Sequence, residues 1–309
     1  MSLYSALKSN GSNGFGYGST AEQVVDGVDL AGKVVAITGV TSGLGAETAR
    51  VLAARGARII GLARTEAGAT EALRALPQDP SSPAIAVACE LSEPGSVRAA
   101  VSALRAGPPL DAIVCNAGIM ALPKLELKHG YELQFFTNHV GHFILVTGLL
   151  DRLAPAGRVV MLSSAAHTMA PRDVGIQLDN LDGAKGYDAW RNYGQSKLAN
   201  LLFARELARR LPRGQTANAV HPGVITTNLG RHMPAWMRAT MAVGRPLFMK
   251  TIPQGAATQS YVAANPGAAA ITGEYWADCN VATSSTHGRD LDLARKLWDA
   301  TVSIVTNLG

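Results

Sequence analysis

The stretch KVVAITGVTSGLG, residues 33–45, decides the fold of this chain. Its first half is a short apolar run rich in β-branched residues, which is typical of a buried strand. Its second half is a glycine-rich turn, and an alanine-rich helical stretch follows it to about Arg55. A glycine turn between a strand and a helix lets backbone N–H groups and the helix dipole face an anion. The stretch therefore predicts a phosphate-binding unit within an α/β fold.

The same alternation continues along the chain. Strand-like runs occur at residues 58–63, 84–89, 111–115, 158–163, 215–220 and about 272–276, with helical stretches between most of them. Apolar strands separated by helices predict a mostly parallel sheet with helices on both faces. We therefore expect a single Rossmann-type, doubly wound α/β domain over residues 20–309. A short helix at about 21–27, capped by Thr20 and Gln23, and a flexible tail over residues 1–19 are expected before it.

The composition narrows the classes of function. Lysine plus arginine (28) exceed aspartate plus glutamate (23) by five, but only 17% of residues are charged and the basic ones are scattered, so no nucleic-acid surface is expected. The sequence contains no run of eighteen apolar residues, so we expect no membrane span. The polar N-terminus lacks the apolar core of a signal peptide. The three cysteines have no paired spacing, which favours a reducing, cytoplasmic location.

Four histidines lie near sequence motifs: His139, His142, His167 and His221. They fall on separate predicted elements and have no acidic partner at the spacing of metal ligands. We interpret them as packing or helix-surface residues, and predict no metal site.

Tyr193 and Lys197 form the candidate catalytic pair. Two residues four apart on a helix lie on the same face, where an ammonium group lowers the pKa of a phenol and makes it a usable acid and base. The same spacing also occurs by chance, with a half-buried tyrosine beside a solvated lysine. The pair needs support from the rest of the chain.

The residue at the end of the second predicted strand indicates whether the cofactor is NAD(H) or NADP(H). A carboxylate at this position would bind the ribose 2′-hydroxyl of NAD, whereas the chain has Ala63 and Arg64. A guanidinium suits a 2′-phosphate, so we favour NADP(H), with NAD(H) as the alternative. Arg64 could also be an ordinary exposed arginine.

Six segments in this order resemble the motifs of the short-chain dehydrogenase/reductase family. They are TGVTSGLG at 38–45, CNAG at 115–118, TNHVGHF at 137–143, SS at 163–164, YGQSK at 193–197 and HPGVITT at 221–227. SSAAH at 163–167, YGQSKLAN, HPGV and KTIPQGAAT at 250–258 are similar to the retinol dehydrogenase and WW-domain oxidoreductase branch. The chain departs from the family pattern at Cys115, where the family has asparagine, and at Glu90, where it has aspartate.

The resemblance implies the site residues. The catalytic residues are Asn138, Ser164, Tyr193 and Lys197: the tyrosine exchanges a proton with the substrate oxygen, the serine holds that oxygen, the lysine also binds the nicotinamide ribose, and the asparagine supports a water beside the lysine. The cofactor-binding residues are Gly39, Thr41, Ser42, Gly43, Leu44, Gly45, Arg64, Glu90, Leu91, Asn116, Ala117, Gly118, Tyr193, Lys197, Pro222, Gly223, Val224, Ile225 and Thr227.

The expected function is that of an NADP(H)-dependent oxidoreductase that interconverts a secondary alcohol and a carbonyl on an apolar small molecule. The alternative is a catalytically silent nucleotide sensor or scaffold with the same fold. A lid over the substrate is expected at about residues 228–252, and Tyr187, Trp190, Met233 and Trp236 are candidate pocket walls. Family members pair through their long helices, so a homodimer or homotetramer is expected, with a monomer as the alternative.

Overall fold

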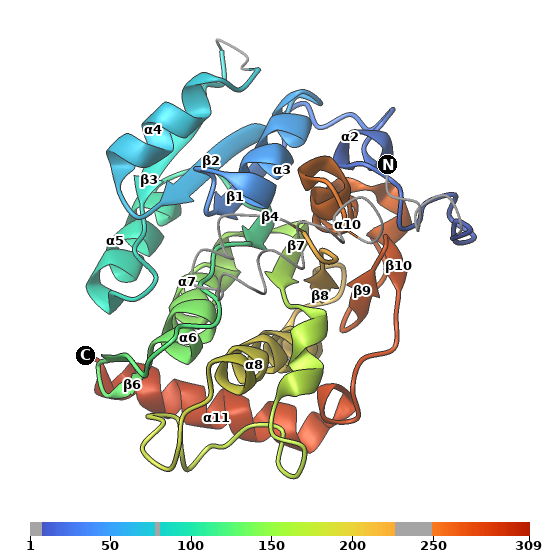
Figure 1. The fold of residues 1–309 in the computed structure, drawn as a ribbon. Coiled ribbons are helices and arrows are strands. Elements are labelled where there is room, and N and C mark those ends of the chain that lie inside the picture. Colours follow the sequence, from blue (N-terminus) through green and yellow to red (C-terminus); the bar gives the residue numbers. More distant parts are fainter. Residues whose placement is uncertain (1–7, 78–80, 226–248) are drawn as a thin grey trace.

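In the computed structural model, residues 8–77, 81–225 and 249–309 are described, and their centre is one eight-stranded sheet (Figure 1). Along the sheet the strands follow the order β10-β9-β8-β7-β4-β1-β2-β3, and only the pairing of β10 with β9 is antiparallel. The strands are β1 (Val34–Thr38), β2 (Arg58–Ala63), β3 (Ile85–Ala88), β4 (Leu110–Cys115), β7 (Leu153–Leu162), β8 (Thr216–His221), β9 (Tyr275–Ala277) and β10 (Asn280–Val281).

Helices cover both faces of the sheet (Figure 1). One layer contains α2 (Ala21–Val24), α3 (Gly43–Ala53), α4 (Glu66–Arg74) and α10 (Ile252–Ala264). The other contains α5 (Pro94–Arg105), α6 (Leu133–Phe135), a π-helix (Phe136–Val140), α7 (Gly141–Thr147), α8 (Ala189–Arg210) and α11 (Leu291–Asn307). The predicted doubly wound, mostly parallel α/β fold is confirmed.

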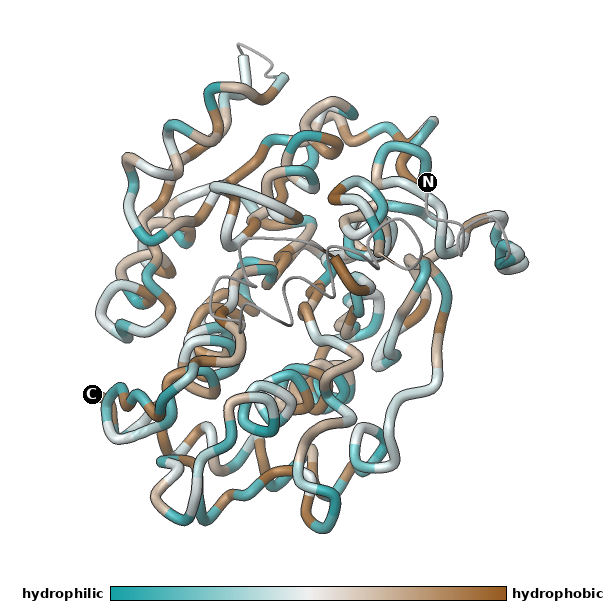
Figure 2. The backbone as a smooth tube through the Cα atoms, viewed as in Figure 1, coloured by the Kyte–Doolittle hydropathy of each residue, from teal (hydrophilic) through white to brown (hydrophobic). Residues whose placement is uncertain are grey.

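The two layers produce two apolar cores, because alternate side chains of each strand point to opposite faces. Val35 and Ile37 of β1 pack into the core with α3 and α10, whereas Val34 and Ala36 pack into the core with α7 and α8. The central strands are mostly white to brown in Figure 2, as expected for strands buried on both sides.

All seven predicted strands occur, with shifts of a few residues at their ends. The largest difference is β7, which begins at Leu153, five residues before the predicted start, because Leu153 also pairs with Leu110 across an irregular register. Three strands have no counterpart in the prediction from the sequence: β10 and the small hairpin of β5 (Leu127–Lys128) and β6 (Tyr131–Glu132), each of which is only two residues long. The predicted capping of α2 by Thr20 and Gln23 is confirmed.

The expectation of a flexible N-terminal tail is wrong for residues 8–19. Asn13 donates a hydrogen bond to the Cys279 carbonyl oxygen at 2.8 Å, and Asn280 donates to the Phe15 carbonyl oxygen at 3.0 Å. The Tyr17 side chain is buried. Polar, glycine-rich composition predicts disorder only if no partner binds the backbone, and the loop between β9 and β10 is such a partner.

Among the described residues, no helix combines the length and the apolar composition that crossing a membrane requires. Cys89, Cys115 and Cys279 are all buried free thiols.

Candidate functional site

The glycine-rich turn between β1 and α3 has the backbone geometry of an anion cradle. Gly39 and Gly43 adopt φ angles of +75° and +62°, which residues with a side chain rarely adopt. A Cβ atom on Gly45 would lie 2.3 Å from the Gly39 carbonyl oxygen, so only glycine permits this approach of helix to strand. Ser42, the N-cap of α3, makes no side-chain capping hydrogen bond, which leaves the first N–H groups of the helix available to an anion.

The turn borders a cavity of about 590 Å³ at the carboxyl ends of β1, β2 and β4. Here the connections from β1 and β4 lead to opposite sides of the sheet, which is where such sheets bind nucleotides. The predicted cofactor-binding residues that line this cavity are Gly39, Thr41, Ser42, Gly43, Leu44, Arg64, Glu90, Leu91, Asn116, Ala117 and Gly118.

The other predicted cofactor-binding residues within the described ranges do not line the cavity. Gly45 lies beneath the turn, and Tyr193 and Lys197 lie on α8. The segment 222–225 (Pro222, Gly223, Val224 and Ile225) follows β8, and Thr227 lies outside the described residues, as do Met233, Trp236 and most of the expected lid.

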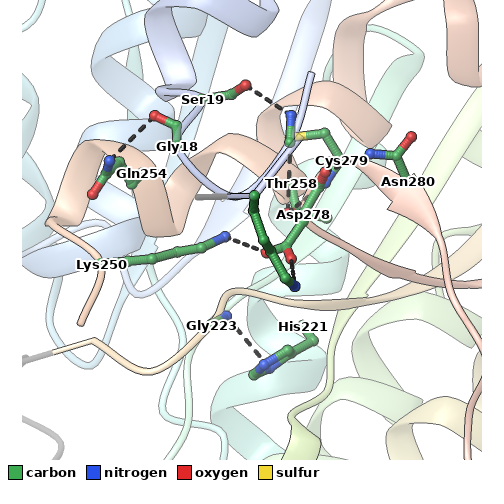
Figure 3. Close-up of polar contacts among 12 residues, drawn as sticks. Gly18, Ser19, His221, Gly223, Lys250, Gln254, Thr258, Asp278, Cys279 and Asn280 are labelled. Atoms are coloured by element: carbon green, nitrogen blue, oxygen red, sulfur yellow. Dashed lines mark hydrogen bonds and ion pairs between the residues drawn. The ribbon is translucent and has the colours of Figure 1, made fainter. Parts of the chain in front are cut away.

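The segment after β8 packs on the buried Lys250, which forms an ion pair with the partly exposed Asp278 (Figure 3). Gly223 has a φ of +92°, and a Cβ atom there would lie 2.7 Å from the Lys250 Cδ atom. The Lys250 Nζ atom lies 2.7 Å from an Asp278 carboxylate oxygen and 4.7 Å from the centroid of the Tyr17 ring. The anchored N-terminal segment thus helps to hold the loop that follows β8.

Arg64 lies at the end of β2 with an exposed side chain and lines the cavity. No ion-pair partner is present for it within the described part of the chain. The next residue, Thr65, caps α4 by accepting a hydrogen bond from the Gly68 N–H group at 3.2 Å. A free guanidinium and a helix N-terminus therefore meet at the same end of the cavity, where both favour an anion.

Glu90 lines the cavity, but its carboxylate serves the turn before α5. It accepts hydrogen bonds from the Ser92 N–H group at 3.1 Å and the Ser92 hydroxyl at 3.0 Å. The longer side chain therefore folds back onto its own loop.

Thr38 connects the end of β1 to the end of β4 and to α7. Its hydroxyl oxygen accepts hydrogen bonds from the N–H groups of Asn116 and Ala117 at 2.9 and 3.0 Å. The same hydroxyl lies 2.9 Å from His142 Nε2, and His142 Nδ1 lies 2.9 Å from the Asn138 carbonyl oxygen. A carbonyl only accepts, so Nδ1 carries the proton and Nε2 accepts from Thr38. Burial lowers the pKa of His142 to about 4, which keeps this ring neutral.

Asn138 is fully buried within the π-helix. Its side-chain amide accepts from the Ile119 N–H group at 2.8 Å and donates to the Ile119 carbonyl and the Ser196 hydroxyl, both at 2.9 Å. Gly118 leaves room for this contact, because a Cβ atom there would lie 2.8 Å from the Asn138 side-chain oxygen. The asparagine therefore joins the loop after β4 to α8. π-Bulges often occur at functional sites.

Tyr193 and Lys197 are both buried on α8, and Lys197 Nζ lies 5.7 Å from the centroid of the Tyr193 ring. The lysine donates a hydrogen bond to the Leu162 carbonyl oxygen at 3.0 Å. Burial raises the pKa of Tyr193 to about 12, which a hydrogen bond with Ser164 only partly offsets, and lowers the pKa of Lys197 to about 8. The expected lowering of the tyrosine pKa by the lysine is wrong for these side chains alone, because burial disfavours both charges.

Ser163 and Ser164 have different partners. The Ser163 hydroxyl is buried and donates to the Lys197 carbonyl oxygen at 2.7 Å, so it ties β7 to α8. Ser164 is partly exposed, and its hydroxyl group interacts with Tyr193 and accepts from the Ala166 N–H group at 3.1 Å. The geometry therefore favours Ser164 as the residue beside the tyrosine.

Several residues of the site were not predicted from the sequence. Thr65 was predictable from the sequence, because a threonine at the start of a helical stretch is a typical N-cap. Thr38 and His142 had none, because their hydrogen bond joins positions 104 residues apart. The further residues that line the cavity are Thr38, Leu62, Ala63, Thr65, Gly68, Cys89, Ile119, Met120, Thr137 and Leu162.

Known proteins share this sequence and fold. The short chain dehydrogenase family profile matches residues 33–175. Short-chain dehydrogenase TIC 32 B, chloroplastic, from Brassica napus is 41% identical and is matched over the whole of both chains. Human retinol dehydrogenase 11 is 38% identical, with 90% of this chain and 87% of the relative covered. Human WW domain-containing oxidoreductase is 40% identical, with 91% of this chain and 70% of the relative covered.

Solved structures of related proteins have a similar fold. An uncharacterised protein from Mycobacterium Paratuberculosis is 32% identical with a TM-score of 0.74, and the match covers 94% of this chain and 98% of that one. A short chain dehydrogenase from Burkholderia cenocepacia, solved in complex with NADP, is 27% identical with a TM-score of 0.65, and the match covers 80% of this chain and 96% of that one. The chain therefore belongs to the short-chain dehydrogenase/reductase family and is an oxidoreductase of the branch that resembles the retinol dehydrogenases and the WW-domain oxidoreductase.

Proposed function

We propose that this protein is an NADP(H)-dependent oxidoreductase that interconverts a secondary alcohol and a carbonyl on an apolar small molecule. The observation that carries the proposal is that Ser164, which follows β7, bonds Tyr193 in the N-terminal half of α8, where Lys197 lies one turn further along. The neighbouring strand β4 ends at the cavity that the glycine-rich turn borders. The nicotinamide, when bound, supplies or accepts the hydride.

The side chains of the site then have separate roles. The Tyr193 hydroxyl gives a proton to the substrate oxygen during reduction, and the same group takes the proton back during oxidation. Ser164 donates a hydrogen bond to that oxygen and stabilises the charge that develops on it. Lys197 binds and orients the nicotinamide ribose. Asn138 holds the loop after β4 beside the lysine.

NADP(H) is the proposed cofactor, with NAD(H) as the alternative. Arg64 and the N-terminus of α4 face the same end of the cavity, which suits the additional phosphate of NADP. The relative from Burkholderia cenocepacia was solved with NADP. The other proposed ligands are the glycines of the turn, the residues around Asn116, and the segment from Pro222 through Thr227.

Several broader proposals belong with this one. We propose one domain over residues 20–309, a substrate lid at about 228–252, and pocket walls that include Tyr187 and Trp190. The Trp190 ring lies 6.3 Å from that of Tyr193.

A cytoplasmic location is supported by the buried free thiols, although the Brassica relative is named chloroplastic. We propose no metal and no nucleic-acid partner. Homodimers, homotetramers and monomers remain the alternatives for assembly.

A panel of ketones and aldehydes tests the function, with NADPH oxidation followed by absorbance. We expect turnover by the wild-type protein and a loss of at least about a hundredfold in kcat for Tyr193→Phe, because proton transfer contributes this much to such reactions. The NADPH dissociation constant should change much less than kcat in that variant, because Tyr193 is only one of many proposed cofactor-binding residues. Tyr131→Phe is the control and should retain activity, because it removes a tyrosine hydroxyl from β6, which contributes no residue to the lining of the cavity. Equal turnover by Tyr193→Phe would contradict the mechanism, and NADPH binding without any turnover would favour the sensor alternative.

A further inference from the structure

Two histidines hold the peptide group that follows Ser164. The His167 Nδ1 atom lies 2.7 Å from the Ser164 carbonyl oxygen, and the His221 Nδ1 atom accepts a hydrogen bond from the Ala165 N–H group at 3.1 Å. These two polar groups belong to the same peptide unit. One histidine follows β7 and the other ends β8, so neighbouring strands of the sheet converge on this peptide.

The roles of the two nitrogens of His167 are determined by their partners. The Ser285 backbone N–H group donates to Nε2 at 3.0 Å, so Nε2 carries no proton. A carbonyl oxygen only accepts, so Nδ1 carries the proton and donates it to Ser164. The ring is buried and packs edge-on against Tyr275 with a centroid distance of 5.0 Å. His167 is therefore a neutral donor in a fixed orientation.

His221 has the opposite role, because both of its partners are donors. Its Nδ1 atom accepts from the Ala165 N–H group and, at 3.4 Å, from the Gly223 N–H group (Figure 3 shows the second contact). Burial lowers the pKa of His221 to about 4, the charge of Lys250 lowers it further, and Asp278 opposes these effects. The ring is neutral at neutral pH, and its lone pair links the serine loop to the glycine turn after β8.

This arrangement determines the direction of the Ser164 side chain. Ser164 has an extended backbone, with φ −162° and ψ 159°, and begins the short 3-10 helix Ala165–Met169. Ala165 itself is exposed, so no packing of its own side chain holds this peptide. Since a peptide group is planar, fixing its C=O and N–H groups fixes the Cα–Cβ direction of the serine once its own backbone angles are set.

We propose that His167 and His221 are positioning residues, which hold the Ser164 hydroxyl toward the substrate oxygen, and that His221 also joins this serine to the Gly223 turn. The proposal rests on the proposed function, because it gives these histidines a role through Ser164. It replaces the interpretation of both residues as packing or surface histidines.

Two pairs of variants test the proposal. Asparagine places an amide at the position of Nδ1, so His167→Asn keeps a donor and His221→Asn keeps an acceptor, whereas His167→Phe and His221→Leu remove them. We expect kcat to fall about tenfold or more in the Phe and Leu variants and to recover in large part in the Asn variants, because small displacements of catalytic groups have effects of this size. NADPH affinity should stay unchanged for His167→Phe and weaken several-fold for His221→Leu.

A double-mutant cycle separates positioning from general damage to the fold. In a Ser164→Ala background, His167→Phe should lower the remaining kcat by less than twofold, because the group that it positions is already absent. If the full tenfold loss persists in that background, the proposal is overturned. Wild-type kcat in both His167→Phe and His221→Leu would overturn it too.

Hydrogen exchange gives a readout that does not depend on activity. The Ala165 amide should be protected in the wild type and in His221→Asn, and it should exchange much faster in His221→Leu, with the melting temperature measured alongside. Equal exchange in all three proteins would overturn the proposal for His221. If the wild type turns over no carbonyl but the Ala165 amide exchanges as expected in the three proteins, the proposed function is wrong. The hydrogen bond from the Ala165 peptide to His221 is then still supported.

Discussion

Arg64 is the residue that we propose selects NADP(H) over NAD(H). It is exposed, lines the cavity and lies next to the cap of α4. We expect Arg64→Ala to weaken NADPH binding by about tenfold or more and to leave NADH binding nearly unchanged, since a charge-assisted hydrogen bond contributes about 1.5–3 kcal/mol. Titration of both cofactors by fluorescence measures the ratio. Arg74→Ala, at the far end of α4, is the control. A preference for NAD(H) that survives Arg64→Ala would contradict the choice of NADP(H).

His142 is a second residue with a role that depends on geometry. Its two nitrogens bind Thr38, which ends β1, and the carbonyl oxygen of Asn138. We expect His142→Phe to lower kcat about tenfold. His142→Asn keeps a donor for Asn138, and His142→Gln keeps an acceptor for Thr38, so comparison of their kcat and NADPH affinity shows which link matters.

His139 provides the matched control for that experiment. It is buried on the same helical segment, but its Nε2 atom lies 3.0 Å from the Thr301 hydroxyl of α11, away from the cavity. His139→Phe should lower the melting temperature without changing kcat. If both phenylalanine variants lose kcat equally, the effect of His142 is one of general stability.

The β1–turn–α3 unit behaves as one element, because strand and helix contact each other through Gly45. A Cβ atom at this position would lie 2.3 Å from the Gly39 carbonyl oxygen and 2.5 Å from Asn116 Nδ2. We expect Gly45→Ala to displace the N-terminus of α3 and weaken NADPH binding at least about tenfold, which corresponds to about 1.4 kcal/mol. Gly95→Ala on α5, where a Cβ atom would meet nothing within 4 Å, is the control and should bind NADPH normally. Unchanged binding by Gly45→Ala would contradict the role of this close approach.

The whole molecule encloses its two long central helical segments. Residues 134–146 and 192–204 are buried on all sides, and α11 packs along α8. The Trp298 ring of α11 stacks on Phe203 at 5.6 Å and contacts Phe143 at 5.0 Å, while Arg210 lies over it at 4.3 Å. Pairing of two copies through these helices would require α11 to leave, so we expect any dimer to use another surface.

Trp298→Ala tests this cover. We expect the free energy of unfolding to fall by about 2 kcal/mol, less than for a fully buried aromatic residue, because Trp298 is only partly buried. Val302→Ala, on the exposed side of α11, should change it by less than about 0.5 kcal/mol. Denaturant titration measures both variants, and light scattering measures the mass of the wild type. Loss of a dimer on substituting residues within 192–204, with the fold intact, would contradict the expectation.

The sequence by itself determined the fold class, seven strands of the sheet and the glycine-rich turn that borders the cavity. These features depend on local patterns that lie within a few residues of each other. The patterns are apolar β-branched runs, the spacing of glycines and the interval between Tyr193 and Lys197. The tertiary structure alone decided which residues meet. The Thr38–His142–Asn138 chain, the two histidines on the Ser164 peptide and the anchoring of residues 8–19 on β10 join positions far apart in the chain. It also reversed the expected pKa shift of Tyr193, because the free energy of a charge depends on burial, and burial follows from packing of the whole chain.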